Sequence, residues 1–239
     1  MSDVRFPQAG LAGALALAAG STAYGAIIVV SPPADVPNAA SPASNPAAGF
    51  INWDVDGDAV SDFRLQFRNP QSTGTFGVVW QANFSPFTAG GTNAVVGYMG
   101  PFVNYGAKLN AGDLIGPTAP GAGNSWRNPA QVVLGSFYRS GGVPSPYGGF
   151  STGTVPSASI VRGFVGFRFT IGGNTRYGWL DVEVRGADTT AGSGGMYFFG
   201  AAYEDTGDPI PAGAVPAPGS LAALALGAAA CARRSRRSA

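Results

Sequence analysis

Residues 161–184 read V-R-G-F-V-G-F-R-F-T-I-G-G-N-T-R-Y-G-W-L-D-V-E-V, and this stretch decides the fold. Apolar residues alternate with polar ones from Val161 to Ile171, apart from Phe164, and again from Leu180 to Val184. Such a period of two is typical of half-buried β-strands. Because Gly172-Gly173-Asn174 stands between the two runs, the stretch predicts an antiparallel hairpin with a tight turn.

Further apolar runs separated by turn residues extend this pattern along the chain. We expect additional strands at Ala26–Val30, Phe50–Trp53, Phe63–Phe67, Gly77–Asn83, Ala94–Tyr98, Gln131–Tyr138 and Met196–Glu204. About nine short strands with turn-rich connections predict an all-β domain, an antiparallel β-sandwich or jelly roll. An N-terminal signal helix and a C-terminal apolar helix are expected to flank it.

The composition agrees with one folded domain. The 37 glycines and 19 prolines provide turns, whereas 15 Phe, 8 Tyr and 4 Trp need a core that buries them. Ser31–Ala48 and Asp205–Pro218 are rich in proline and small residues, so both are expected to be linkers. The insertion Gly112–Asn128 is expected to be a long loop.

Charge and residue types exclude several functions. The chain has no histidine and one cysteine, Cys231, which excludes a His-dependent triad and a zinc site of the usual His/Cys type. Without Arg5, Asp3 and the four arginines near the C-terminus, the 14 basic and 13 acidic residues become 9 and 12. A mildly acidic domain with Lys108 as its single lysine lacks the basic patch that binds nucleic acid.

The segment Asp54–Asp62 contains the best candidate site. Its aspartates occupy relative positions one, three, five and nine, and a backbone carbonyl at Val60 would supply position seven; the candidate calcium ligands are Asp54, Asp56, Asp58, Val60 and Asp62. The pattern resembles the calcium loops of integrin-type FG-GAP repeats and dockerins, but Ala59 replaces their glycine at position six. An acidic turn that binds no ion is the alternative.

Two alternative functions rest on scattered residues. Exposed aromatic rings can stack on sugars, and the candidates for a lectin-like module are Trp80, Trp126, Tyr98, Tyr105, Tyr138 and Tyr147. Trp126, in a Gly/Pro/Asn-rich loop, is expected to be the exposed glycan contact. A polysaccharide hydrolase would need two carboxylates, for which Asp181 and Glu183, with Glu204 or Asp113, are candidates.

The N-terminus has the pattern of a secretory signal peptide. Arg5 precedes an apolar run from Ala9 to Ala19, and small residues follow. Cleavage after Ala23 and cleavage after Gly25 both fit, and an uncleaved anchor is the alternative. The expected domains are therefore a signal peptide at 1–25, a β-sandwich at 26–210 and a sorting tail at 211–239.

The C-terminus has three parts that together make a sorting tail. A proline-rich motif is followed by the apolar run Leu221–Ala232 and a basic cluster; the residues are Val215, Pro216, Ala217 and Pro218 in the motif, and Arg233, Arg234, Arg236 and Arg237 in the cluster. The apolar run is short for a membrane span, and the arginines would stop transfer. A permanent membrane anchor is the alternative.

This tail resembles the PEP-CTERM sorting signal of exosortase substrates, with Pro-Ala-Pro in place of Pro-Glu-Pro. Gly163–Ile171, Tyr177–Leu180 and Ala202–Glu204 resemble a module that recurs in such surface proteins. The resemblance implies the export machinery and an exosortase-type enzyme as partners, membrane contact through the C-terminal helix, and association with exopolysaccharide or biofilm matrix. It also implies a precursor held at the inner membrane and a final place at the cell surface or in the matrix.

The sequence therefore predicts an exported, non-enzymatic surface or matrix protein that is stabilised by calcium.

Overall fold

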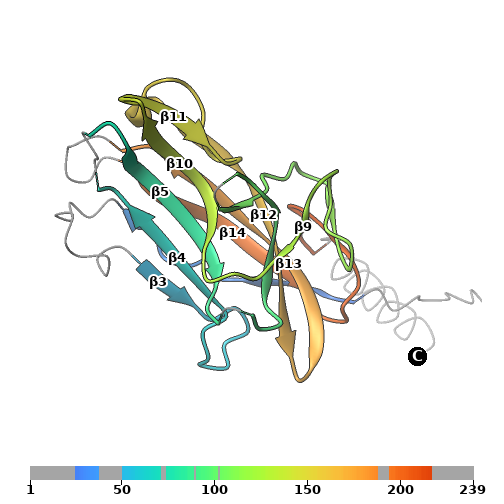
Figure 1. The fold of residues 1–239 in the computed structure, drawn as a ribbon. Coiled ribbons are helices and arrows are strands. Elements are labelled where there is room, and N and C mark those ends of the chain that lie inside the picture. Colours follow the sequence, from blue (N-terminus) through green and yellow to red (C-terminus); the bar gives the residue numbers. More distant parts are fainter. Residues whose placement is uncertain are drawn as a thin grey trace, which may run out of the picture.

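The computed structural model describes residues 25–37, 50–70, 74–88, 90–101, 103–187 and 194–216. The described chain is nearly all β (Figure 1), as expected, and its one helical segment is the single 3-10 turn Pro156–Ala158. The strands are β1 (Ile27–Val30), β2 (Val36–Pro37), β3 (Phe50–Trp53), β4 (Phe63–Arg68), β5 (Gly77–Pro86), β6 (Ala94–Met99), β7 (Asn104–Gly106), β8 (Leu114–Ile115), β9 (Ser125–Arg127), β10 (Val132–Ser140), β11 (Val143–Tyr147), β12 (Ile160–Ile171), β13 (Asn174–Arg185), β14 (Gly195–Glu204) and β15 (Ile210–Pro211).

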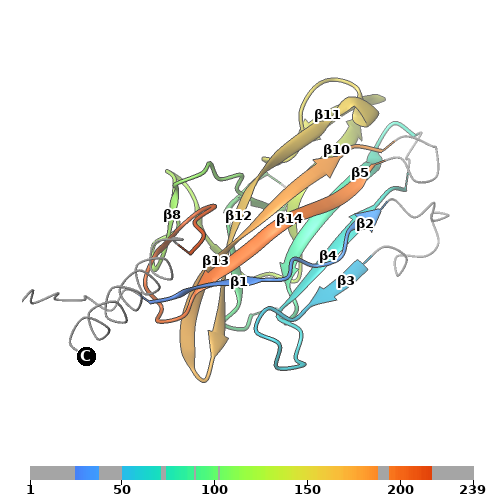
Figure 2. The ribbon, with the colours of Figure 1, turned by 180° about the vertical axis from the view of Figure 1, so that it is seen from behind.

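The strands form one large curled sheet in the order β1-β14-β13-β12-β6-β7-β10-β5-β4-β3, with β2, β9 and β11 attached beside it. The β14-β13-β12 half lies behind the β10-β5-β4 half (Figures 1 and 2), so the two halves form the layers of a sandwich-like body. The sheet is mixed, because β7 and β10 pair in parallel. The expected purely antiparallel order therefore does not hold at this one pairing of the described strands.

The quoted hairpin is confirmed, with longer strands than expected. Strand β12 pairs with β13 from Ile160↔Arg185 to Ile171↔Asn174, so the loop is only Gly172-Gly173. Both glycines have positive φ, 56° and 84°, the geometry of a two-residue turn that matches the twist of the strands.

The main core lies between the two halves of the sheet. Apolar residues at alternate positions of β4, β12 and β13 point into it and are fully or nearly fully buried. Its centre is aromatic: the rings of Phe63 and Phe84 lie 4.8 Å apart, and Phe167 contacts both. The alternation that predicted half-buried strands thus corresponds to one face directed into this core.

A second apolar cluster covers the opposite face of β12 and β13. The ring of Phe164, the exception to the alternation, meets Trp179 edge-on at 5.5 Å, and both belong to this cluster. Ile115 of β8 and Ile210 of β15 close it from outside. The segment Gly112–Asn128 is therefore more ordered than the expected loop, because β8 and β9 form within it.

The linker expected at Ser31–Ala48 is also partly structured. Strand β2 pairs with β14 within it, and Val36 is buried. Residues 38–48 lie outside the described part of the chain, as do residues 1–24 of the expected signal peptide 1–25 and the apolar run Leu221–Ala232. Within the part that is described, no helix has the length and apolar character needed to cross a membrane.

Hydrogen bonds fasten both ends of the packed body. The backbone N–H of Ala26 donates to Asp205 Oδ1 at 2.7 Å, and Asp205 N donates back to Ala26 O. At the other end, Trp179 Nε1 donates to Ala214 O at 3.1 Å and Ala212 is buried. The packed body therefore runs from Ala26 to Ala214, four residues past the boundary expected at 210.

Candidate functional site

The aspartate loop, residues 54–62, connects the paired strands β3 and β4. Asp62 N donates to Trp53 O at 2.9 Å, which closes the loop at its base. Val55 is buried in the main core although both of its neighbours are acidic. The loop is thus fastened to the sandwich at its base and by one apolar side chain.

Three of the four predicted aspartates converge in this loop. One carboxylate oxygen from each of Asp54, Asp56 and Asp58 lies within 4.8 Å of the others. The carboxylate of Asp54 accepts hydrogen bonds from Gly57 N and Ala59 N, both at 2.8 Å. These turns bring the three carboxylates to one side of the loop, an arrangement of hard oxygen ligands that suits a calcium ion.

Ala59 occupies the position where the resembled loops have glycine. Its φ is +70°, and it is the one non-glycine residue with a positive φ in the described segments. The sharp turn expected from the sequence is therefore made despite the Cβ, at a cost in backbone strain of about 1–2 kcal/mol.

Asp62 has a different role from the other three aspartates. Its Oδ2 accepts from Val55 N at 3.0 Å and its Oδ1 accepts from Asn93 Nδ2 at 2.9 Å. It lies outside the converging group, and Val60, the predicted carbonyl ligand, uses its N–H to donate to Asp58 Oδ1. Asp62 therefore fixes the loop to the sheet, while Asp54, Asp56 and Asp58 form the candidate ligand set.

Burial and crowding of charge raise two pKa values in the loop. Burial raises the pKa of Asp62 from 3.8 to about 6, against the hydrogen bonds from Val55 and Asn93 that lower it. Burial also raises the pKa of Asp56, and the neighbouring charges of Asp58 and Asp54 add to this. A bound divalent cation would relieve this repulsion.

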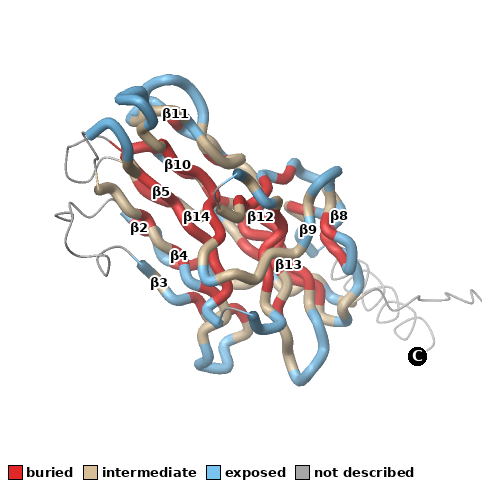
Figure 3. The backbone as a smooth tube through the Cα atoms, in the orientation of Figure 1, coloured by how far each residue is buried: buried red, intermediate tan, exposed pale blue. Residues whose placement is uncertain are grey.

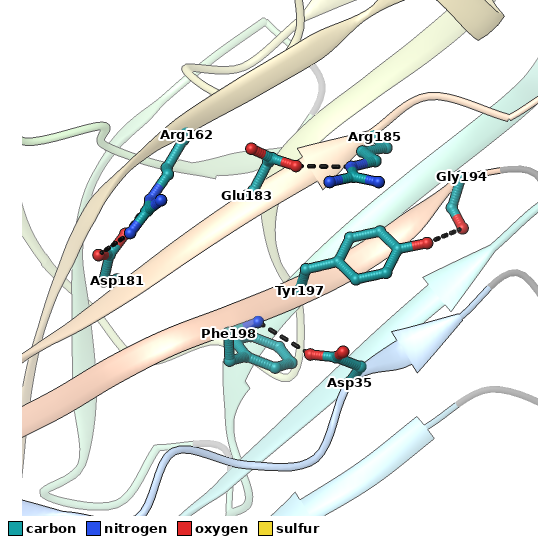
Figure 4. A network of polar contacts seen from close by, with 8 residues as sticks. All are labelled: Asp35, Arg162, Asp181, Glu183, Arg185, Gly194, Tyr197 and Phe198. Atoms are coloured by element: carbon teal, nitrogen blue, oxygen red, sulfur yellow. Dashed lines mark hydrogen bonds and ion pairs between the residues drawn. The ribbon is translucent and has the colours of Figure 1, made fainter.

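The carboxylates considered for a hydrolase are held by arginines on the outer face of β12 and β13 (Figure 4). Asp181 accepts two hydrogen bonds from Arg162, at 3.0 and 2.8 Å, and Glu183 pairs with Arg185 at 2.5 Å. The guanidinium carbon of Arg162 lies 3.6 Å from the centre of the Phe199 ring. These contacts form a surface ladder of ion pairs and cation–π pairs.

Glu204 and Asp113 do not join that pair. Glu204 is buried, and its carboxylate accepts from Thr206 N, Gly207 N and Asp208 N, so it organises the turn after β14. Asp113 accepts from Asn110 N at 2.8 Å. Each therefore has a local structural contact of its own.

The aromatic candidates separate into three groups. Trp80 is fully buried in the main core. Trp126, expected to be exposed, is half-buried: Nε1 donates to Pro117 O and the ring lies 5.9 Å from that of Tyr177. The four tyrosines come from β6, β7, β10 and β11, and Tyr105, Tyr138 and Tyr147 line one hollow.

Sequence reasoning missed the polar residues beside that hollow. Gln81, Asn83 and Ser85 alternate with core residues in β5 and are buried on its other face. The available signal was the alternation of Gln, Asn and Ser with Trp80, Ala82 and Phe84.

The sorting residues lie at the edge of the described chain. Val215 and Pro216 are exposed beyond the packed body, whereas Ala217, Pro218 and the arginine cluster lie outside the described residues. Comparisons with protein-family models, with curated proteins and with solved structures find no match to this chain.

Proposed function

We propose that this chain is an exported, non-enzymatic protein of the cell surface or extracellular matrix. Its body is a sandwich or jelly roll of a mixed, mainly antiparallel sheet, and we propose that calcium at the aspartate loop stabilises it. The proposed partners are the export machinery and an exosortase-type enzyme that acts on the PEP-CTERM-like tail, with exopolysaccharide as a matrix component.

The observation that supports this proposal best is where packing ends. Among the described residues, packing extends from Ala26 to Ala214, and Val215, the first residue of the proposed sorting motif, is exposed. The contacts of Ala26 and Ala214 lie inside these limits, so the proposed removal or membrane insertion of the flanking segments would leave them in place. That is the arrangement expected of a cargo body between two addressing segments.

Calcium has its own support in the loop. Three carboxylate groups converge next to a buried anchor, and burial, together with the charges of Asp58 and Asp54, raises the pKa of Asp56. A cation at this point would hold β3 and β4 together at their shared turn. Its proposed role is structural, because the loop connects two paired strands and its base is closed by the Asp62 N–H to Trp53 O hydrogen bond.

The test is the location of the full chain in bacteria that contain an exosortase-type enzyme, followed with an antibody against the body. We expect the full chain at the surface, where added protease digests it, and a variant without residues 215–239 in the medium. The variant Leu15→Arg, which interrupts the apolar signal run, should stay inside the cell. Full-length protein that stays protected in the cytosol would contradict the proposal.

A further inference from the structure

The outer face of β4, β5 and β10 is polar and uncovered by any described strand (Figure 1). Leu65, Ala82 and Phe84 point into the main core from these strands, so the residues between them point outward. The outward residues include the amides and hydroxyls Gln66, Gln81, Asn83, Ser85, Ser136 and Tyr138, together with the cations Arg64 and Arg68 at the β4 side. We call this surface the amide face.

The polar residues of the amide face are unusually buried for an outer surface. Gln81, Asn83, Ser85 and Ser136 are 7%, 3%, 5% and 6% exposed, and β5 and β10 are largely buried in Figure 3. Outward polar residues of a sheet normally meet water. Here they form the floor of two hollows.

The two hollows are adjacent. One, of about 370 Å³, contains Gln81, Ser136 and the tyrosines, and the other, of about 400 Å³, contains Asn83, Ser85 and Gln131. Gln131 Nε2 donates to Gln81 Oε1 at 3.1 Å and lies 3.4 Å from Asn83 Oδ1, which connects them. Together they form a strip across the strands, with the Gln131 side chain between them, and each is in the size range of small-ligand sites.

Aromatic rings form one wall of this strip. Tyr105, Tyr138 and Tyr147 line the first hollow, and the ring of Tyr98 stacks behind Tyr105 at 5.6 Å. A Cβ at Gly100 would lie 2.2 Å from the Tyr105 ring, so the backbone approaches this ring closely. The Tyr105 ring is therefore fixed before any ligand arrives, which lowers the entropy cost of binding.

One donor on the floor has no partner. Asn83 Nδ2 is buried, and no group in the described structure accepts a hydrogen bond from it. Such a group costs about 1–3 kcal/mol in the free protein, so it is rarely retained without a reason. Asn83 lines the second hollow, where a ligand oxygen would satisfy it.

We propose that the amide face binds a neutral polysaccharide chain, with sugar rings stacked on the tyrosines and a sugar oxygen accepting from Asn83 Nδ2. The lining of the tyrosine hollow contains no acidic or basic side chain, which matches an uncharged ligand. In the second hollow the cation Arg64 already donates to Asn52 Oδ1 and lies over the rings of Phe50 and Phe87. Sugars combine apolar ring faces with hydroxyl edges, as this surface requires.

This inference is independent of export and of calcium. The test is binding of the full chain, in mild detergent, to an array of neutral glucans, mannans, galactans and xylans, acidic alginate and hyaluronan, and a polyproline peptide. We expect binding to at least one neutral polysaccharide. Tyr138→Ala and Asn83→Leu should each weaken it at least about tenfold, the effect of removing an anchor.

Two control variants test whether the effect is specific. Tyr138→Phe keeps the aromatic ring and should retain binding. Tyr197→Ala removes a tyrosine of β14 that lies under Arg185 of β13, away from the amide face. Thermal unfolding of each variant identifies any loss of folding. Binding to no neutral polysaccharide, binding to acidic polysaccharide or polyproline alone, or equal losses in Tyr138→Ala and Tyr197→Ala would overturn the proposal.

Discussion

The aspartate loop and the amide face are two polar regions built in opposite ways. The loop takes its groups from nine consecutive residues, carries charge, and uses its own N–H groups to satisfy its carboxylates. The amide face takes mainly neutral groups from β4, β5 and β10, is walled by tyrosines of β7 and β11, and leaves one buried donor unpaired. The loop thus suits a cation, and the face suits an uncharged ligand with oxygen acceptors.

The contrast also concerns rigidity. The loop projects from the sandwich with Asp58 and Val60 exposed, and its shape depends on local turns. The amide face is the back of the main core, so its floor cannot shift without disturbing the rings packed beneath it. A bound cation would therefore order the aspartate loop, whereas a ligand on the amide face would occupy a surface that is already rigid.

Calcium should have the largest effect on stability, and that effect should depend on the aspartate loop and not on the amide face. At a calcium concentration 100 times the Kd, the free energy of unfolding should rise by about 2.7 kcal/mol. Denaturant unfolding with calcium and with chelator measures this. Asp56→Asn should lose most of the gain, whereas Asp208→Asn, an exposed acid outside the loop, and Asn83→Leu should keep it. Identical unfolding curves with and without calcium would show that the loop does not bind calcium.

The pH dependence without calcium should come next. Because the pKa of Asp62 is raised from 3.8 to about 6, the folded state binds its proton more tightly than the unfolded state. This contribution to stability is complete below pH 3.8 and is lost as the pH rises through about 6. Asp62 is partly exposed, so after solvent screening we expect a loss of roughly 1–2 kcal/mol.

Urea unfolding between about pH 3.5 and 7, in the presence of chelator, tests this, because that range includes both pKa values of Asp62. Asp62→Asn should flatten the curve in that window, and Asp208→Asn should leave it unchanged. A stability that rises with pH across the window and depends on Asp62 would contradict the assignment of burial as the dominant cause.

Asn83→Leu should separate stability from binding on the amide face. The substitution removes a buried donor without a partner and keeps a similar shape, so the free protein should gain up to about 1 kcal/mol. Denaturant unfolding measures the gain. Gln131→Leu, whose Nε2 already donates to Gln81, is the matched comparison and should not stabilise. A loss of more than about 1 kcal/mol in Asn83→Leu would show that Asn83 is satisfied.

Ala59→Gly should have the smallest effect. Glycine adopts the φ of +70° without strain, so stability without calcium should rise by about 0.5–1 kcal/mol despite the greater freedom of the unfolded chain. Ala111→Gly, at an exposed turn position without positive φ, should be neutral or slightly destabilising. The same change in both variants would mean that Ala59 is not strained.

The sequence predicted the structural features that depend on residues close together in the chain. The alternation around Phe167 and Leu180 placed the central hairpin and its inward face, and the spacing of Asp54, Asp56 and Asp58 placed their convergence. These follow from the period of a strand and the geometry of a turn. Export, calcium and the sorting tail stay predictions.

The rest depended on pairings between distant segments. Nothing local indicates that Val132 pairs in parallel with Asn104, or that the chain around Ile115 returns to cover Trp179. The tyrosines around the amide face are brought together only by that strand order, and a bulge between Phe137 and Tyr138 sets the register of Tyr138 against β5. Trp126 was expected in solvent because its cover, Tyr177 and Arg168, lies on strands far along the chain.

The pairing of β1 with β14 has a consequence for the timing of folding. Ile27 lies opposite Glu204, so the first strand finds its partner only when almost the whole body has been synthesised. Sheets dominated by such distant pairings fold slowly, within about milliseconds to seconds, because a long loop must close first. In the export that we propose, such slow folding would keep the body unfolded during passage through a narrow translocation channel, and the closure of its last edge would follow on the far side.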